Sequence, residues 1–150
     1  MNELIADDPK LSDVRNTGLI TAICHAIESR SEKPLLRDPK AEAIADQLAP
    51  QLATTPDKIL RCLSQGEKFA GKDLMVTGAA LRARKYDEYA RDFAQRHPGR
   101  RVVNLGCGLD TRFWRIDDGR LHLYDLDLPE TIALKRQLVQ ESDRYHMIGM

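Results

Sequence analysis

The sequence lacks any apolar stretch that approaches the roughly 20 residues a transmembrane helix needs. Residues 1–8 also lack the basic segment and the apolar core that together mark a secretory signal. We therefore expect a cytoplasmic protein with no membrane partner.

The chain also lacks an excess of charge of either sign. Lys plus Arg and Asp plus Glu both total 23, so the formal net charge is zero, and like charges form no run. Proteins that bind nucleic acids carry basic stripes or patches that neutralise phosphates. The charge balance therefore argues against a nucleic-acid partner.

Cysteine and histidine are few and scattered. The three cysteines are an odd number at wide spacings, which favours neither a disulfide framework nor a thiolate metal site. The four histidines include no pair four residues apart, so we interpret them as surface or packing residues. We expect no bound metal ion.

The first two thirds of the chain have a helical pattern. Apolar residues recur at helical spacing over 17–27, 41–48 and 59–63. The second helix should begin after Asp38-Pro39 and end before Pro50, and Thr55-Pro56 should cap and open the third. The longest helical pattern covers 74–95, where one stripe contains Ala79, Arg82, Tyr86, Tyr89 and Phe93.

The pattern changes after His97-Pro98-Gly99, which should stop the long helix. Residues 101–105 contain the β-branched pair Val102-Val103 and are followed by glycine, as expected of a buried strand. Residues 121–125 and 145–150 have the composition of further strands. A helix should begin at Pro129 between the second and third strands. This alternation predicts the α/β class, with a parallel, doubly wound sheet preceded by helices.

Such a sheet would be incomplete, because parallel sheets are normally covered on both faces and flanked by further strands. We therefore predict one incomplete domain over residues 1–150. Residues 1–97 would form its helical N-terminal part, and residues 98–150 the first strands and helices of its sheet. The alternative is a compact helical domain that carries a small sheet edge.

The most informative segment is the glycine turn after the first strand. Gly106 and Gly108 would let the backbone turn tightly and approach a ligand closely. Asp125 and Asp127 follow about 20 residues later, at the end of the next strand, where a carboxylate can accept hydrogen bonds from both ribose hydroxyls. Together these residues predict a nucleoside pocket.

The pocket does not match a dinucleotide site, because Thr111 stands where the third glycine of that motif is required. S-Adenosylmethionine carries no phosphate and presents an ammonium and a carboxylate instead. A carboxylate is best bound by arginine, which Arg82 or Arg84 could supply from the helix before the strand. Alternatively, Arg84 pairs with Glu88, or both arginines face solvent.

Residues 104–115, Asn-Leu-Gly-Cys-Gly-Leu-Asp-Thr-Arg-Phe-Trp-Arg, resemble the N-L-G-x-G-x-D-T-x-x-x-R motif of leucine carboxyl methyltransferases and bacterial polyketide O-methyltransferases. Residues 124–129 with Lys135 are similar to the family's acidic-x-Asp-x-Pro segment and its helical lysine. Arg82-x-Arg84-x-x-Asp87 is similar to its arginine-rich helix. The chain thus resembles the N-terminal portion of a class I S-adenosylmethionine-dependent methyltransferase, with a truncated Rossmann-like fold.

The resemblance implies roles for individual residues. Gly106 and Gly108 would form the floor under the methionine part of S-adenosylmethionine, and Asp127 would bind the ribose hydroxyls. Arg84 would hold the carboxylate of this methyl donor, with Arg82 beside it.

The remaining positions of the motif are less constrained. Asp110 matches the family's turn aspartate, either as a direct contact or as a turn former. Asp125 replaces what is often a glutamate, as a neighbour of the ribose. Cys107 occupies a variable position, and we interpret it as a small spacer rather than a nucleophile.

The resemblance further implies an O-methyltransferase that acts on a carboxylate or hydroxyl of an unidentified acceptor, either a small molecule or a protein. No catalytic residue can be assigned, because the family's acceptor-binding elements would lie beyond Met150. We therefore expect this segment alone to bind its donor weakly or not at all. The alternatives are a non-catalytic scaffold module that retains the turn and, third, an NAD-dependent oxidoreductase.

Overall fold

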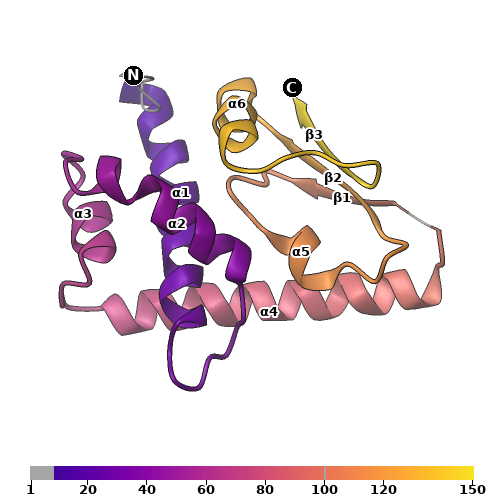
Figure 1. The fold of residues 1–150 in the computed structure, drawn as a ribbon, viewed down its shortest axis with the longest axis horizontal. Helices are drawn as coiled ribbons and strands as arrows, with labels where there is room; N and C mark the ends of the chain where they lie inside the picture. The colour runs from indigo at the N-terminus through magenta and orange to yellow at the C-terminus, as the bar shows by residue number, and fades with distance from the viewer. Residues whose placement is uncertain (1–8, 100) are drawn as a thin grey trace.

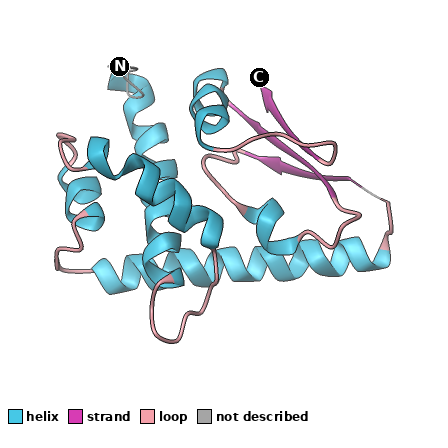
Figure 2. Ribbon diagram, in the orientation of Figure 1, coloured by secondary structure: helices cyan, strands magenta, loops and turns pink. Residues whose placement is uncertain are grey.

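The computed structural model describes residues 9–99 and 101–150. Four helices come first, namely α1 (Pro9–Ser29), α2 (Pro39–Leu52), α3 (Lys58–Ser64) and α4 (Lys72–Arg96). Strand and helix then alternate, as predicted except for the short helix α5, in the order β1 (Arg101–Leu105), α5 (Arg112–Ile116), β2 (His122–Asp127), α6 (Pro129–Leu138) and β3 (Tyr145–Gly149). Figure 2 shows α1 to α3 gathered at one end of the molecule and the strands at the other. None of these helices is long and apolar enough to cross a membrane.

Helix α4 connects the two ends. It runs beneath both the α1–α2 pair and α5 (Figure 1), and it packs against α1 and α5. Its buried residues are Val76, Ala80, Ala83 and Asp87, whereas Tyr86 and Tyr89 on the predicted stripe are mainly exposed. That stripe is therefore not the packing face, because the close approach of α1 selects small side chains for the interface.

Two helix ends differ from the prediction. Helix α2 continues through Pro50 to Leu52, because the extra turn buries the Leu52 side chain in the core. Helix α3 is capped by Asp57 rather than Thr55, since Asp57 Oδ1 accepts a hydrogen bond from the Leu60 backbone N–H at 3.0 Å. Helix α2 begins at Pro39, and Asp38 before it is the N-cap, since its side chain accepts from the Ala41 N–H at 3.0 Å.

The three strands are parallel and adjacent in chain order, β1-β2-β3. Leu123, Tyr145 and Met147 on one face join the core formed with α5 and α6. On β1, Leu105 is 72% exposed and Val103 is also exposed, so the prediction of a buried strand is wrong for this edge position. The parallel sheet with helices confirms the α/β class, although one face lacks the cover of a doubly wound sheet in the described part of the chain.

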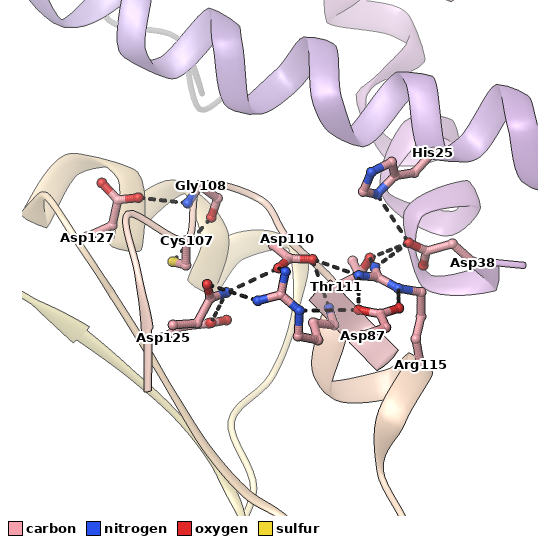
Figure 3. Close-up of polar contacts among 12 residues, drawn as sticks. His25, Asp38, Asp87, Cys107, Gly108, Asp110, Thr111, Arg115, Asp125 and Asp127 are labelled. Atoms are coloured by element: carbon pink, nitrogen blue, oxygen red, sulfur yellow. Dashed lines mark hydrogen bonds and ion pairs between the residues drawn. The ribbon is translucent and has the colours of Figure 1, made fainter. Parts of the chain in front are cut away.

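A buried guanidinium joins the helices to the sheet (Figure 3). The Arg115 side chain of α5 is 3% exposed. It donates to Asp38 Oδ2 at 2.7 Å, to Asp87 Oδ2 at 2.7 Å and to Asp110 Oδ1 at 3.1 Å. These carboxylates belong to the N-cap of α2, to α4 and to the turn after β1. One cation therefore holds three segments that are distant in sequence.

The polar contacts continue into the sheet. Arg112 donates to Asp87 Oδ1 at 3.2 Å and to Asn104 Oδ1 at 3.1 Å. Asn104 Nδ2 donates to Asp125 Oδ1 at 2.9 Å, and Lys135 Nζ donates to Asp125 Oδ2 at 2.7 Å. The network thus extends from α4 through β1 to β2 and α6, and it pairs charges that would be costly to bury alone.

The network changes the proton affinities of its members. Burial opposes ionisation of Asp38, but the hydrogen bond from His25 and the charge of Arg115 hold its pKa below the ordinary value. Burial likewise opposes ionisation of Asp110, yet Arg115 and Arg112 lower the pKa of this carboxyl. Burial would lower the pKa of Arg115, but its bond to Asp87 and the surrounding carboxylates raise it. All three groups are therefore ionised at neutral pH.

Replacing Arg115 should destabilise the fold strongly. Arg115→Met leaves three carboxylates around an apolar side chain, and we expect the free energy of unfolding to fall by about 3–5 kcal/mol. Urea denaturation followed by circular dichroism measures this loss. Arg120→Met removes an arginine that is 77% exposed, and as the control it should change stability by less than about 0.5 kcal/mol. Equal effects of the two substitutions would show that the network does not hold the fold.

The same network should make the protein sensitive to acid. Because the pKa values of Asp38 and Asp110 are lower in the folded state, their contribution to stability is complete above the unfolded Asp pKa of about 3.9. It is lost as the pH falls through that value towards the folded pKa. In Asp38→Asn the free energy of unfolding should be lower at pH 7 and should fall less steeply below about pH 4. Denaturation curves at several pH values measure this slope, and an unchanged slope would contradict the assignment.

Candidate functional site

The network surrounds one side of a cavity of about 500 Å³. The cavity lies between α1, α4, the β1–α5 turn, the end of β2 and the first turns of α6. Its lining includes Thr17, Gly18, Thr21, His25, Arg82, Tyr86, Asn104, Gly106, Gly108, Asp110, Arg112, Asp127 and Thr131. Five of the seven residues proposed from the sequence as cofactor contacts are therefore part of one cavity, namely Arg82, Gly106, Gly108, Asp110 and Asp127.

The glycine turn forms one wall of the cavity. Gly106 and Gly108 have φ angles of +62° and +50°, in the left-handed region that side chains disfavour. A Cβ atom on Gly108 would lie 3.4 Å from the Cα of Gly18 in α1. Helix α1 therefore approaches the turn backbone to backbone, and side chains there would separate the two.

Asp127 lies at the end of β2 and faces this turn. Its Oδ2 accepts a hydrogen bond from the Gly108 N–H at 2.7 Å (Figure 3). Its Oδ1 accepts one from the Leu128 N–H at 2.7 Å. Each carboxylate oxygen can accept a second hydrogen bond. The fixed carboxylate is thus able to bind two adjacent hydroxyls of a ligand.

The two arginines of α4 occupy different surroundings. Arg82 lines the cavity, whereas Arg84 does not. Arg84 Nε lies 3.7 Å from Glu88 Oε1, and both side chains are about half exposed. The structure therefore shows the alternative ion pair for Arg84 and brings only Arg82 to the predicted pocket.

Asp110 lines the cavity, but its oxygens bind mostly within the turn. Oδ1 accepts from the Arg112 backbone N–H at 3.0 Å, and Oδ2 accepts from Asn104 Nδ2 at 3.2 Å. Arg115 and the Arg112 side chain pair with the same carboxylate. This geometry agrees with the alternative prediction that Asp110 is a turn former.

Asp125 is buried beneath the site rather than in its lining. Asn104, Lys135 and Tyr145 all donate to its carboxylate, the Tyr145 hydroxyl at 2.6 Å. In this arrangement Asp125 supports Asn104 from behind, and Asn104 rather than Asp125 lines the cavity.

Cys107 has the character of a packing residue. Its thiol is buried, and although Lys135 acts in the opposite direction, burial raises its pKa to about 12. A thiol that is protonated at neutral pH is a poor nucleophile. This agrees with the prediction that Cys107 is a spacer.

The sequence did not reveal the contribution of α1. Thr17, Thr21 and His25 are spaced four residues apart, so they share one face of the helix, and all three line the cavity. This polar stripe within residues 17–27, which are otherwise apolar apart from one glycine, is a signal that could have been detected. Arg115 matches the last arginine of the motif, but its structural role could not be predicted, because its three carboxylate partners are brought together only by the fold.

Comparison with known proteins agrees with the motif. Residues 18–145 match the family profile described as leucine carboxyl methyltransferase. The chain is 34% identical over 141 residues to the tetracenomycin polyketide synthesis O-methyltransferase TcmP of Streptomyces glaucescens, a match that covers 93% of this chain and 47% of that protein.

The names of two mycobacterial relatives give S-adenosyl-L-methionine as the cofactor. A protein of Mycobacterium bovis named as an S-adenosyl-L-methionine-dependent methyltransferase is 34% identical over 127 residues, with 83% of this chain and 36% of that protein covered. One of Mycobacterium tuberculosis with the same name is 32% identical over 135 residues, covering 85% and 42%. The chain thus spans less than half the length of these relatives. The motif, the arrangement of its glycines and Asp127, and the match over 18–145 together show that the chain belongs to the leucine carboxyl methyltransferase family.

Proposed function

We propose that this chain contributes the donor-binding part of an S-adenosylmethionine-dependent O-methyltransferase that acts on a carboxylate or hydroxyl oxygen. The observation that carries the proposal is the cavity in which Gly106, Gly108 and Asp127 meet. Family membership supports the same cofactor and reaction class.

The chemistry of the lining fits the methyl donor. The glycine turn exposes backbone to a ligand without side chains in the way, and Asp127 offers acceptors for the ribose hydroxyls. Arg82 offers a guanidinium for the donor's carboxylate. We therefore assign to Arg82 the contact that the family resemblance suggested for Arg84.

The reaction requires little acid–base catalysis from these residues. The donor, when bound, supplies a methyl group on an already activated sulfonium. The task of the protein is to fix the attacking oxygen in line with that methyl carbon. A carboxylate acceptor is already ionised, whereas a hydroxyl acceptor would need a base.

The fold of the whole protein follows from the same proposal. Residues 98–150 would supply the first strands and helices of a Rossmann-like, class I methyltransferase sheet, with residues 1–97 as a helical N-terminal part. The exposed apolar face of β1 supports this division, since parallel sheets are covered on both faces when complete.

Removing the Asp127 carboxylate should weaken donor binding. In Asp127→Ala we expect the Kd for S-adenosylmethionine to rise at least about tenfold, because charge-assisted hydrogen bonds to the ribose are lost. Isothermal calorimetry measures the Kd, both on the 150-residue chain and on the longest natural polypeptide that contains it.

Asp118→Ala is the matched control, since Asp118 is exposed and lies outside the cavity. An unchanged Kd for S-adenosylmethionine in Asp127→Ala would contradict the assignment of this cavity as the donor-binding pocket. Titration with NAD tests the oxidoreductase alternative, and a polypeptide that binds neither cofactor would favour the scaffold alternative.

The two arginines of α4 provide a second test. Arg82→Met should raise the Kd for S-adenosylmethionine about tenfold or more, because the donor's carboxylate loses its cationic partner. Arg84→Met, the same substitution two residues away, should leave the Kd unchanged and remove only the pair with Glu88. The reverse result, with Arg84 sensitive and Arg82 insensitive, would restore the original assignment of Arg84.

A further inference from the structure

One wall of the cavity contains a histidine ring with an unused nitrogen. His25 of α1 lines the cavity and is 3% exposed. Its Nδ1 lies 3.5 Å from Asp38 Oδ2, whereas its Nε2 is buried and has no hydrogen-bond partner among the described residues. A buried polar atom without a hydrogen-bond partner is unfavourable, so the position calls for a partner in the cavity.

The carboxylate beside it fixes the orientation of the ring. Asp38 accepts hydrogen bonds from the Ala41 N–H at 3.0 Å, from the Thr111 hydroxyl at 2.6 Å and from Arg115 at 2.7 Å. Since this carboxylate is held on several sides and is ionised, Nδ1 of His25 carries a hydrogen that points at it. In the neutral ring Nε2 is then an acceptor, and it suits a ligand group that only donates.

The His25 ring and the Asp127 carboxylate, which we propose to bind the ribose, lie at opposite sides of the site. In Figure 3, Asp127 and Gly108 are on one side, His25 is on the other, and Asp110 lies between them. If the ribose of the donor binds at Asp127, as the proposed function requires, the amino-acid part extends along the glycine turn towards α1 and α4. That part carries one carboxylate and one ammonium group, and Arg82 on α4 suits the carboxylate.

We propose that His25 Nε2 accepts a hydrogen bond from the α-ammonium group of the bound methyl donor. The inference rests on the proposed function and deepens it by assigning the ammonium to α1. An ammonium has only donors, which matches a bare acceptor nitrogen. A carboxylate in the same place would instead require a proton on Nε2.

Three ligands separate the possible contacts. S-Adenosylmethionine carries both groups, decarboxylated S-adenosylmethionine keeps only the ammonium, and 5′-methylthioadenosine lacks the amino-acid part. The variant His25→Asn keeps an amide nitrogen near the position of Nδ1, facing Asp38, but has no atom at Nε2. Calorimetry should show the Kd of the first two ligands rising about tenfold in this variant, and that of methylthioadenosine unchanged.

The exposed His97 at the end of α4 provides the matched control, and His97→Asn should leave all three Kd values unchanged. Weaker binding of S-adenosylmethionine but not of the decarboxylated ligand would assign His25 to the carboxylate and overturn the proposal. An equal loss for all three ligands, or no loss, would also overturn it. If the longest natural polypeptide, unsubstituted, binds none of the three ligands, the proposed function itself fails, and that outcome is distinct from the others.

A measurement without substitution covers the case in which His25→Asn does not fold. With ¹⁵N-labelled histidine, the Nε2 resonance of His25 should shift when S-adenosylmethionine or its decarboxylated form is added. It should not shift with methylthioadenosine. A resonance that none of the three ligands moves, although they bind, would overturn the proposal.

Discussion

The structure depends on the placement of one buried cation among three carboxylates. Arg115 is almost fully buried, so its charge is tolerable only while Asp38, Asp87 and Asp110 surround it. Each of these carboxylates is fixed to a different segment, so their meeting point sets the distance between α2, α4 and the glycine turn. Apolar packing is non-directional and would permit small shifts, whereas this geometry permits few.

The carboxylates around Arg115 also determine the shape of the cavity. Asp38 also orients His25, and Asp110 also forms the turn that brings Gly108 to Asp127. Hence the residues that hold the fold together are directly behind those that face the cavity. The cavity wall is built from side chains whose rotamers are already fixed by contacts on their far side.

The sequence was sufficient for the parts of the site that depend on local chain geometry. A glycine turn after a strand, and an aspartate at the end of the next strand, follow from the parallel arrangement itself, which brings such ends to one edge of the sheet. Gly106, Gly108 and Asp127 could be selected for that reason. The helices could be placed as well, although their ends at Pro50 and Asp57 were decided by burial and side-chain capping.

The parts that could not be predicted depend on helix rotation and on distant contacts. Arg82 and Arg84 are two residues apart, which on a helix places them on nearly opposite faces. Which of them faces the cavity follows from the rotation of α4, whose buried face includes Ala80 and Ala83. Similarly, Asp125 and Asp127 point to the same side of β2, yet Lys135 and Tyr145 enclose only Asp125.

The hydrogen bond between Gly108 and Asp127 has a further consequence for recognition. The carboxylate is immobilised by the backbone of the neighbouring loop, so its torsional freedom is lost when the chain folds and not when a ligand arrives. If a ribose binds here, as the proposed function requires, its affinity depends on how well the diol matches a rigid template, and compounds whose hydroxyls are set at another angle are rejected by geometry alone.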